Sequence, residues 1–86
     1  MGKRYERITY SDHAEEQIAF RDYLTKALVE EALNAATPEP ARGEALQVCY
    51  PIPGRDRLVV LVIYFEATAK SAYVVTVYPV QKGRLK

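Results

Sequence analysis

The first third of the chain carries one short strand pattern followed by one helix pattern. Apolar and polar residues roughly alternate from Tyr5 to Tyr10, which predicts a short edge strand. Ser11 or Asp12 is suited to cap the helix that follows, and acidic residues crowd its first turns, where they favour the positive end of the helix dipole. The spacing of its apolar residues predicts a helix over about 12–21.

A second helix pattern follows and is the clearest in the chain. Thr25 is a suitable N-cap, and the apolar positions after it fall within one arc of a helical wheel: Leu28, Val29, Ala32, Leu33 and Ala36. The segment Thr37-Pro38-Glu39-Pro40 ends this helix, because the residue before a proline avoids the α region and proline has no N–H to donate.

The rest of the chain carries three strand patterns, at Leu46 to Ile52, Arg57 to Phe65 and Tyr73 to Val80. Pro53-Gly54-Arg55-Asp56 has the composition of a turn, and the loop Ala67 to Ser71 is too short for a crossover helix, so neighbouring strands should be antiparallel. The sequence therefore predicts an α+β fold of order (β)ααβββ. Two N-terminal helices would pack on one face of a three- to four-stranded antiparallel sheet.

The middle strand is apolar on both faces rather than at every second residue. Leu58 to Phe65 contains only apolar and aromatic side chains, which predicts that both faces of the sheet are covered at its centre. Two helices can cover one face. The other face needs a partner, a ligand or a second copy of the chain, unless the N-terminal strand and the tail fold over it.

Composition and charge narrow the class of protein. The 86 residues are enough for a single domain, 1–86, and twelve Lys and Arg against eleven Asp and Glu leave a net charge of +1. That balance lacks the strong positive charge of a dedicated nucleic-acid binder. Half of the positive charge nevertheless lies in the two ends, 1–7 and 81–86, which would form one basic patch if they meet, or else be solvated, flexible ends.

Metal, disulfide and membrane chemistry find little support in the residues. Cys49 is the single cysteine and His13 the single histidine, so neither a disulfide nor a zinc site of the usual composition can form within one chain, and no cofactor is expected. The basic start lacks the apolar stretch of a secretory signal, and the longest apolar run is far shorter than the ~20 residues of a membrane-spanning helix. We therefore expect a cytoplasmic protein without membrane contact.

Several short motifs follow one another between about Ile8 and Pro79. They are Ser11-Asp12-His13-Ala14, Arg21 eight positions after the histidine, Asn34-Ala35-Ala36-Thr37-Pro38, the apolar strand Leu58 to Val62, and Val74-Val75-Thr76-Val77-Tyr78-Pro79. In this order and spacing they resemble the DUF4258 family of small uncharacterised proteins. The family pattern usually has a second arginine between the histidine and the later arginine, and this chain has Gln17 there.

The DUF4258 family is in turn similar in fold to the RelE-like toxins, in which a helix pair packs on an antiparallel sheet. Members of that larger group cut messenger RNA, often on the ribosome, and are usually blocked by a protein partner. The resemblance therefore implies an mRNA endonuclease, the toxin component of a toxin–antitoxin pair. RNA or the ribosome and an antitoxin protein would be its partners.

The residues can supply part of the chemistry that a metal-independent ribonuclease needs, which is a base, an acid and cations around the phosphate. Histidine exchanges protons near neutral pH, so His13 is the candidate acid or base, and Arg21 could grip a phosphate. Gln17 lies between them on one border of the helix, because the three residues are spaced at i, i+4 and i+8.

Structural roles for the same side chains remain open. His13 could instead be a partly buried residue bonded to the backbone or to Thr76 or Tyr78 of the sheet. Arg21 could instead form an ion pair with an acid such as Asp22 or Glu44, or pack its aliphatic stem over the sheet.

Tyrosines and basic residues on the sheet are the candidate RNA contacts. Tyr50, Tyr64 and Tyr78 lie one on each predicted strand and would form a cross-strand aromatic patch for bases if the register places them on one face. Otherwise they are ordinary strand residues with an apolar ring and a wet hydroxyl. The predicted RNA-binding set is Gln17, Tyr50, Arg57, Thr76, Tyr78, Lys82 and Arg84.

A non-catalytic function is the alternative. The two-sided apolarity of the middle strand and the near-neutral net charge suit a protein-interaction module. Such a module would hold a protein partner, or form a homodimer, through the open face or edge of its sheet.

Overall fold

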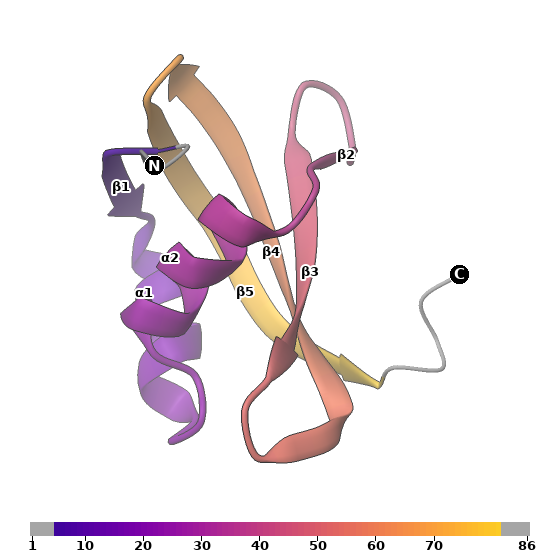
Figure 1. Cartoon of the computed structure of the whole chain (residues 1–86). Coiled ribbons are helices and arrows are strands. Elements are labelled where there is room, and N and C mark those ends of the chain that lie inside the picture. Colours follow the sequence, from indigo (N-terminus) through magenta and orange to yellow (C-terminus); the bar gives the residue numbers. More distant parts are fainter. Residues whose placement is uncertain (1–4, 82–86) are drawn as a thin grey trace.

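The sheet and two helices of the computed structural model form an α+β domain, described here over residues 5–81 (Figure 1). The elements are β1 (Arg7–Tyr10), α1 (Asp12–Phe20), α2 (Lys26–Ala35), β2 (Glu39–Pro40), β3 (Leu46–Ile52), β4 (Arg55–Thr68) and β5 (Ser71–Gln81). Ser11 and Thr25 cap the two helices, since their side chains accept hydrogen bonds from the N–H groups of Ala14 and Leu28. The predicted helix pair and C-terminal strands are confirmed.

The sheet differs from the prediction in strand number and direction. Its order is β1-β5-β4-β3-β2, and β1 pairs with β5 in parallel, from Arg7 opposite Ser71 to Tyr10 opposite Val74. The sheet is therefore five-stranded and mixed, whereas the sequence predicted three or four antiparallel strands. The direction of β1 is set by a partner more than 60 positions away, which local patterning cannot indicate.

The fifth strand comes from the segment predicted only to end the second helix. Glu39 and Pro40 pair with Gln47 and Leu46 of β3. A tight loop returns the chain, with Gly43 at a φ of 61° that favours glycine. β2 is thus a two-residue edge strand rather than loop.

The hairpin between β3 and β4 is tighter than predicted. Ile52 pairs with Arg55, so only Pro53 and Gly54 form the turn, and Gly54 has a φ of 80°. Proline at the first central position and a positive φ at the second are the signature of a type II turn. Arg55 and Asp56, predicted as turn residues, belong to β4.

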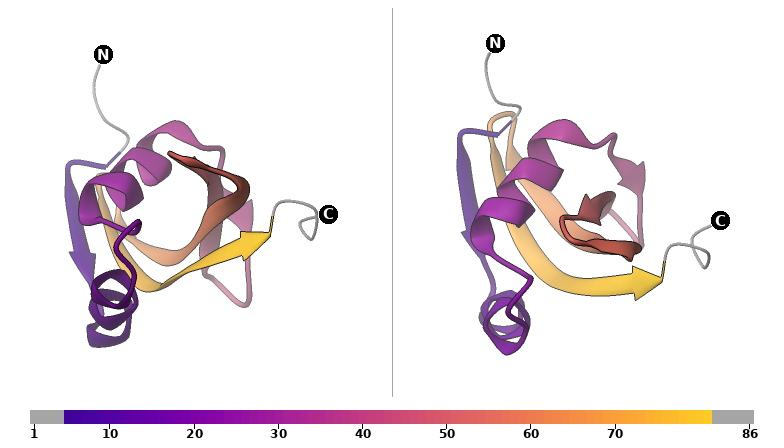
Figure 2. Two further views of the ribbon diagram at one scale, coloured as in Figure 1. Left: turned by 90° about the horizontal axis from the view of Figure 1, so that it is seen from below. Right: turned by 60° about the horizontal axis from the view of Figure 1, so that its bottom comes forward.

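The core lies between α2 and the concave face of the sheet, which curves around that helix (Figure 2). On this face Val60, Val62 and Tyr64 of β4 are completely buried. α1 packs beside β5, past the end of β1, and contributes Ala14 and Ile18 to the same core.

A hydroxyl network ties the segment before β1 into this core. Tyr5 is 1% exposed, and its hydroxyl lies 3.1 Å from that of Tyr64 and donates to Oε2 of Glu66 over 2.7 Å. The backbone N–H of Tyr5 donates to Oδ1 of Asn34 on α2 over 2.8 Å. Tyr5, although in the basic N-terminal end, is therefore a core residue.

The convex face of the sheet, called the open face below, carries the alternate residues of β4. Val59 and Leu61 are each 6% exposed and lie between paired neighbours, Val59 between Pro51 and Val80. Farther along β4, Phe65 pairs with Tyr73 of β5, and both rings are about two-fifths exposed. The N-terminal strand does not fold over this face but joins the sheet edge, and the tail, 82–86, lies outside the described residues.

Neither helix in residues 5–81 has the length and apolar character that crossing a membrane would require.

Candidate functional site

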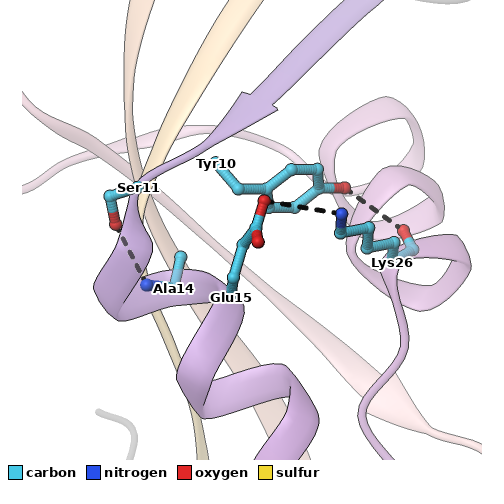
Figure 3. A network of polar contacts seen from close by, with 5 residues as sticks. All are labelled: Tyr10, Ser11, Ala14, Glu15 and Lys26. Carbon is cyan, nitrogen blue, oxygen red and sulfur yellow. Dashed lines mark hydrogen bonds and ion pairs between the residues drawn. The ribbon is translucent and has the colours of Figure 1, made fainter.

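Ser11 fixes the start of α1 against β5. Its N–H donates to the carbonyl oxygen of Val74 over 2.9 Å, and its hydroxyl donates to that of Val75 over 2.8 Å. The same hydroxyl accepts the N–H of Ala14 (Figure 3). Val75 is an extra residue in the ladder, because Tyr64 pairs with Val74 and Ile63 with Thr76. α1 therefore begins at a β-bulge and runs beside the second half of β5 (Figure 1).

One border of α1 faces α2. Glu15 forms an ion pair with Nζ of Lys26 over 3.6 Å, and that ammonium lies 5.0 Å from the ring centroid of Tyr10 (Figure 3). The hydroxyl of Tyr10 donates to the carbonyl oxygen of Lys26. Burial, with smaller contributions from Glu30 and Glu15, raises the pKa of Tyr10. The ion pair places Glu15 on the side of α1 that faces α2.

The predicted row of His13, Gln17 and Arg21 lies on the opposite border of α1. On a wheel of 100° per residue, the row and Glu15 fall on either side of the buried stripe of Ala14 and Ile18. Because Glu15 faces α2, the row faces away from α2. Below, "the α1 row" means these three residues.

Within the α1 row, the structure joins two of the three side chains. Nη1 of Arg21 donates to Oε1 of Gln17 over 3.3 Å, and both residues are half-buried. Neither Asp22 nor Glu44 forms the alternative ion pair with Arg21 in the described part of the chain. His13 is exposed. Among residues 5–81 its side chain forms no hydrogen bond with the backbone, Thr76 or Tyr78, which were the structural alternatives for it.

Three predicted sheet residues lie on the open face. Thr76 pairs with Ile63 and Tyr78 with Leu61, which places both on this face of β5, the strand that α1 lies against. Tyr78 is 36% exposed and lines a hollow of about 460 Å³ together with 79–81. Arg57 is exposed and has the same parity on β4 as Leu61.

The predicted aromatic patch does not form. Tyr50 pairs with Val60, whereas Tyr78 pairs with Leu61, and neighbouring residues of one strand point to opposite faces. Tyr50 donates instead to Oε2 of Glu31 on α2, and this hydrogen bond raises the pKa of Tyr50. Tyr64 is fully buried. Tyr50 and Tyr64 therefore lie on the helix side and cannot share a surface with Tyr78.

The remaining predicted contacts, Lys82 and Arg84, lie outside the described residues, as does the meeting of the two basic ends. Two features near the end of α1 were not among the predicted site residues. Phe20 is 80% exposed, and the guanidinium of Arg55 lies 4.3 Å from the ring centroid of Tyr23. The helical wheel places Phe20 on the same border of α1 as His13, about 10 Å farther along the axis, so the sequence could have predicted this position. The contact of Arg55 depends on the tertiary fold.

Cys49 lies on the open face, opposite Leu61, and is partly buried. Burial, followed by the charge of Glu39, raises the pKa of its thiol, which is the opposite of what a reactive cysteine requires. Across residues 5–81 no group of three or more His, Cys, Asp or Glu side chains is arranged to hold a metal ion.

Comparison with known proteins identifies a similar fold. No family model matches the sequence, and no curated protein matches it. Among solved structures, the 1.1 Å crystal structure of the Brucella abortus ribonuclease toxin BrnT is similar, with a TM-score of 0.65 and 16% sequence identity. The match covers 88% of this chain and 97% of that one. The protein thus shares its α+β fold with that structure, and its resemblance to DUF4258 stays a prediction.

Proposed function

We propose that this protein is an RNA-cleaving toxin, an mRNA endonuclease whose site lies where the α1 row meets the open face of β5. The observation that carries the proposal is the fold, which nearly the whole chain shares with a protein described as a ribonuclease toxin. The exposed histidine and the oriented arginine on one helix border support it.

Arg21 is the proposed phosphate-binding residue. A guanidinium has five N–H donors, and Gln17 accepts one of them, so the others are free to form charge-assisted hydrogen bonds with a phosphate. The glutamine and the half-buried position hold the guanidinium in one orientation, which reduces the entropy lost on binding. Gln17 thus orients Arg21, and it does not supply the positive charge of the second arginine that the family pattern usually has at this position.

The proposed reaction is attack of a ribose 2′-hydroxyl on the neighbouring phosphorus. The P–O2′ bond forms, the P–O5′ bond breaks, and a 2′,3′-cyclic phosphate and a 5′-hydroxyl result. His13 would take the proton of the 2′-hydroxyl or give one to the leaving oxygen. Arg21 would stabilise the negative charge that develops on the phosphate oxygens. Thr76, Tyr78 and Arg57 would contact the rest of the RNA from the open face.

The test is cleavage of RNA by the purified protein, both free and on translating ribosomes. We expect His13→Ala to lower the cleavage rate by about 10²- to 10⁴-fold and Arg21→Ala by about 10²- to 10³-fold. Arg42→Ala is the matched control, since Arg42 is exposed in the loop between β2 and β3, and it should retain activity. Absence of cleavage in both assays, with no growth defect on expression, would refute the proposal.

An antitoxin is the proposed protein partner. A toxin of this kind needs an inhibitor that covers its active surface, and an adjacent reading frame for a DNA-binding protein would be its expected source. Co-expression of that protein should abolish the growth defect and protect the α1 row from solvent in hydrogen exchange.

A non-catalytic interaction module is the second candidate, favoured by the exposed pair of Phe65 and Tyr73 on the open face. Two large apolar rings side by side would be covered in a homodimer. Light scattering at tens of micromolar should then give the mass of a dimer, and Phe65→Lys should give a monomer. A wild-type monomer at that concentration would exclude the homodimer.

A further inference from the structure

Phe20 is the most exposed of the large hydrophobic side chains in residues 5–81, with 80% of its surface in solvent. It ends α1, seven positions after His13, so the two residues lie only about 20° apart on the helical wheel. An aromatic ring held in water on the same border of α1 as His13, about 10 Å farther along the axis, is an unusual placement for a residue that is buried in most proteins.

Two arginines lie against aromatic rings at this end of the molecule. The guanidinium of Arg21 is 5.3 Å from the ring centroid of Phe20, and that of Arg55 is 4.3 Å from the ring centroid of Tyr23. Tyr23 lies in the connection between α1 and α2, and Arg55 follows the β3–β4 turn, so the hairpin end is next to this connection (Figure 1). We call these four residues the Phe20 platform.

We propose that the Phe20 platform binds one unpaired RNA base, stacked on Phe20, with Arg21 and Arg55 on the phosphates beside it. This inference rests on the proposed function and adds a base-binding subsite next to the cleavage site. Exposed aromatic rings combined with arginines are the means by which proteins hold single-stranded nucleic acid, because every base has a π-face. Tyr23 is half-buried and serves mainly to position Arg55.

The charges around Phe20 favour contact with a single nucleotide over contact with a long stretch of the RNA backbone. Glu16 and Asp22 are exposed and close to Phe20 in sequence, Glu16 one helical turn before it. These acids would repel further phosphates, so binding should depend on the stacked base. An apolar protein partner would have to desolvate both guanidinium groups, which disfavours it. We expect Glu16→Gln to raise RNA affinity about two- to threefold by removing one such repulsion.

The chain contains no tryptophan, so one introduced at the platform reports on stacking. Phe20→Trp should show fluorescence quenching when a single-stranded oligonucleotide with 2′-O-methyl groups is added, since this probe cannot supply the attacking hydroxyl. Ala35→Trp is the control, because Ala35 is exposed at the end of α2 in a hollow lined by Glu30 and Glu31. Its fluorescence should not change. No quenching of Phe20→Trp at saturating oligonucleotide would overturn the inference.

Kinetics separate this inference from the proposed function. Phe20→Ala should act mainly on KM for RNA, raising it about tenfold, whereas His13→Ala should act mainly on kcat. Phe20→Leu keeps the apolar volume without the ring and should behave like Phe20→Ala. If the wild type cleaves RNA and Phe20→Ala leaves KM unchanged, the subsite is wrong and the proposed function stands. If the wild type does not cleave but Phe20→Trp is quenched, the proposed function is wrong and the base-binding site is supported.

A protein occupant of the platform would give a different result. Phe20→Ala would then weaken binding of the co-expressed partner and leave oligonucleotide affinity unchanged, which would overturn the inference. Circular dichroism of each variant should match the wild type, since Phe20 is exposed and its replacement leaves the core intact.

Discussion

The hydroxyl network of Tyr5, Tyr64 and Glu66 allows a sharp prediction about stability. The Tyr5 hydroxyl has one proton and donates it to Glu66, so the Tyr64 hydroxyl is the donor in the contact between the two tyrosines. Tyr64 is completely buried, and this contact is the hydrogen bond that satisfies its hydroxyl. Tyr5→Phe therefore leaves a buried hydroxyl without a partner, whereas Tyr64→Phe leaves Tyr5 still bonded to Glu66.

The two substitutions should differ in cost. An unsatisfied buried hydroxyl costs about 1–3 kcal/mol, while loss of one hydrogen bond without an orphaned partner costs about 0.5–1.5 kcal/mol. Loss of the hydrogen bond from Tyr5 to Glu66 adds little to the cost of Tyr5→Phe, because Glu66 is exposed and its carboxylate can bond to water instead. We expect Tyr5→Phe to lower the free energy of unfolding by about 2 kcal/mol and Tyr64→Phe by about 1 kcal/mol. A domain of this size has roughly 4–13 kcal/mol in total.

The double variant is the decisive measurement. Replacing both partners of a buried hydrogen bond by apolar groups of the same shape can be nearly neutral, so Tyr5→Phe with Tyr64→Phe should be more stable than Tyr5→Phe alone. Urea unfolding followed by far-ultraviolet circular dichroism measures this, with an unchanged m-value as the check on two-state unfolding. A double variant whose cost equals the sum of the two single costs would refute the reasoning.

Further predictions concern Ser11 at the start of α1, stability at alkaline pH and the thiol of Cys49. Ser11→Ala removes the cap of α1 and the bond to Val75, so the unfolding free energy should fall by about 1–2 kcal/mol in urea titrations, while Ser11→Thr should retain most of it. Burial, then bonds to Tyr64 and Glu66, raises the pKa of Tyr5, so the folded state holds this proton longer than the unfolded state. The contribution of this proton to the unfolding free energy should be fully present below about pH 10 and should be lost above it. The unfolding free energy of Tyr5→Phe should therefore fall less steeply with pH than that of the wild type, and equal slopes would contradict this reasoning. Burial raises the pKa of Cys49, so iodoacetamide should modify the native thiol more slowly than the unfolded one at pH 8.

Local chemistry in the sequence was sufficient for most of the secondary structure. The caps at Ser11 and Thr25, the Pro53-Gly54 turn and the bounds of β3 depend on residues close together in the chain, and the structure confirms them. The α1 row was predictable for the same reason, because residues spaced by four share a helix border whatever the helix packs against. That part of the candidate site needed no tertiary information.

The sheet side of the candidate site was decided by the tertiary structure. Shifting a strand by one residue moves every side chain to the other face, so only the observed register could separate Tyr50 from Tyr78. The parallel pairing of β1 and the contact of Arg55 with Tyr23 likewise join distant segments. The sequence determined which elements form and which helix border carries His13, because those depend on near neighbours. The fold alone determined which sheet residues share the open face and which arginine lies against Tyr23, because those depend on pairing across the chain.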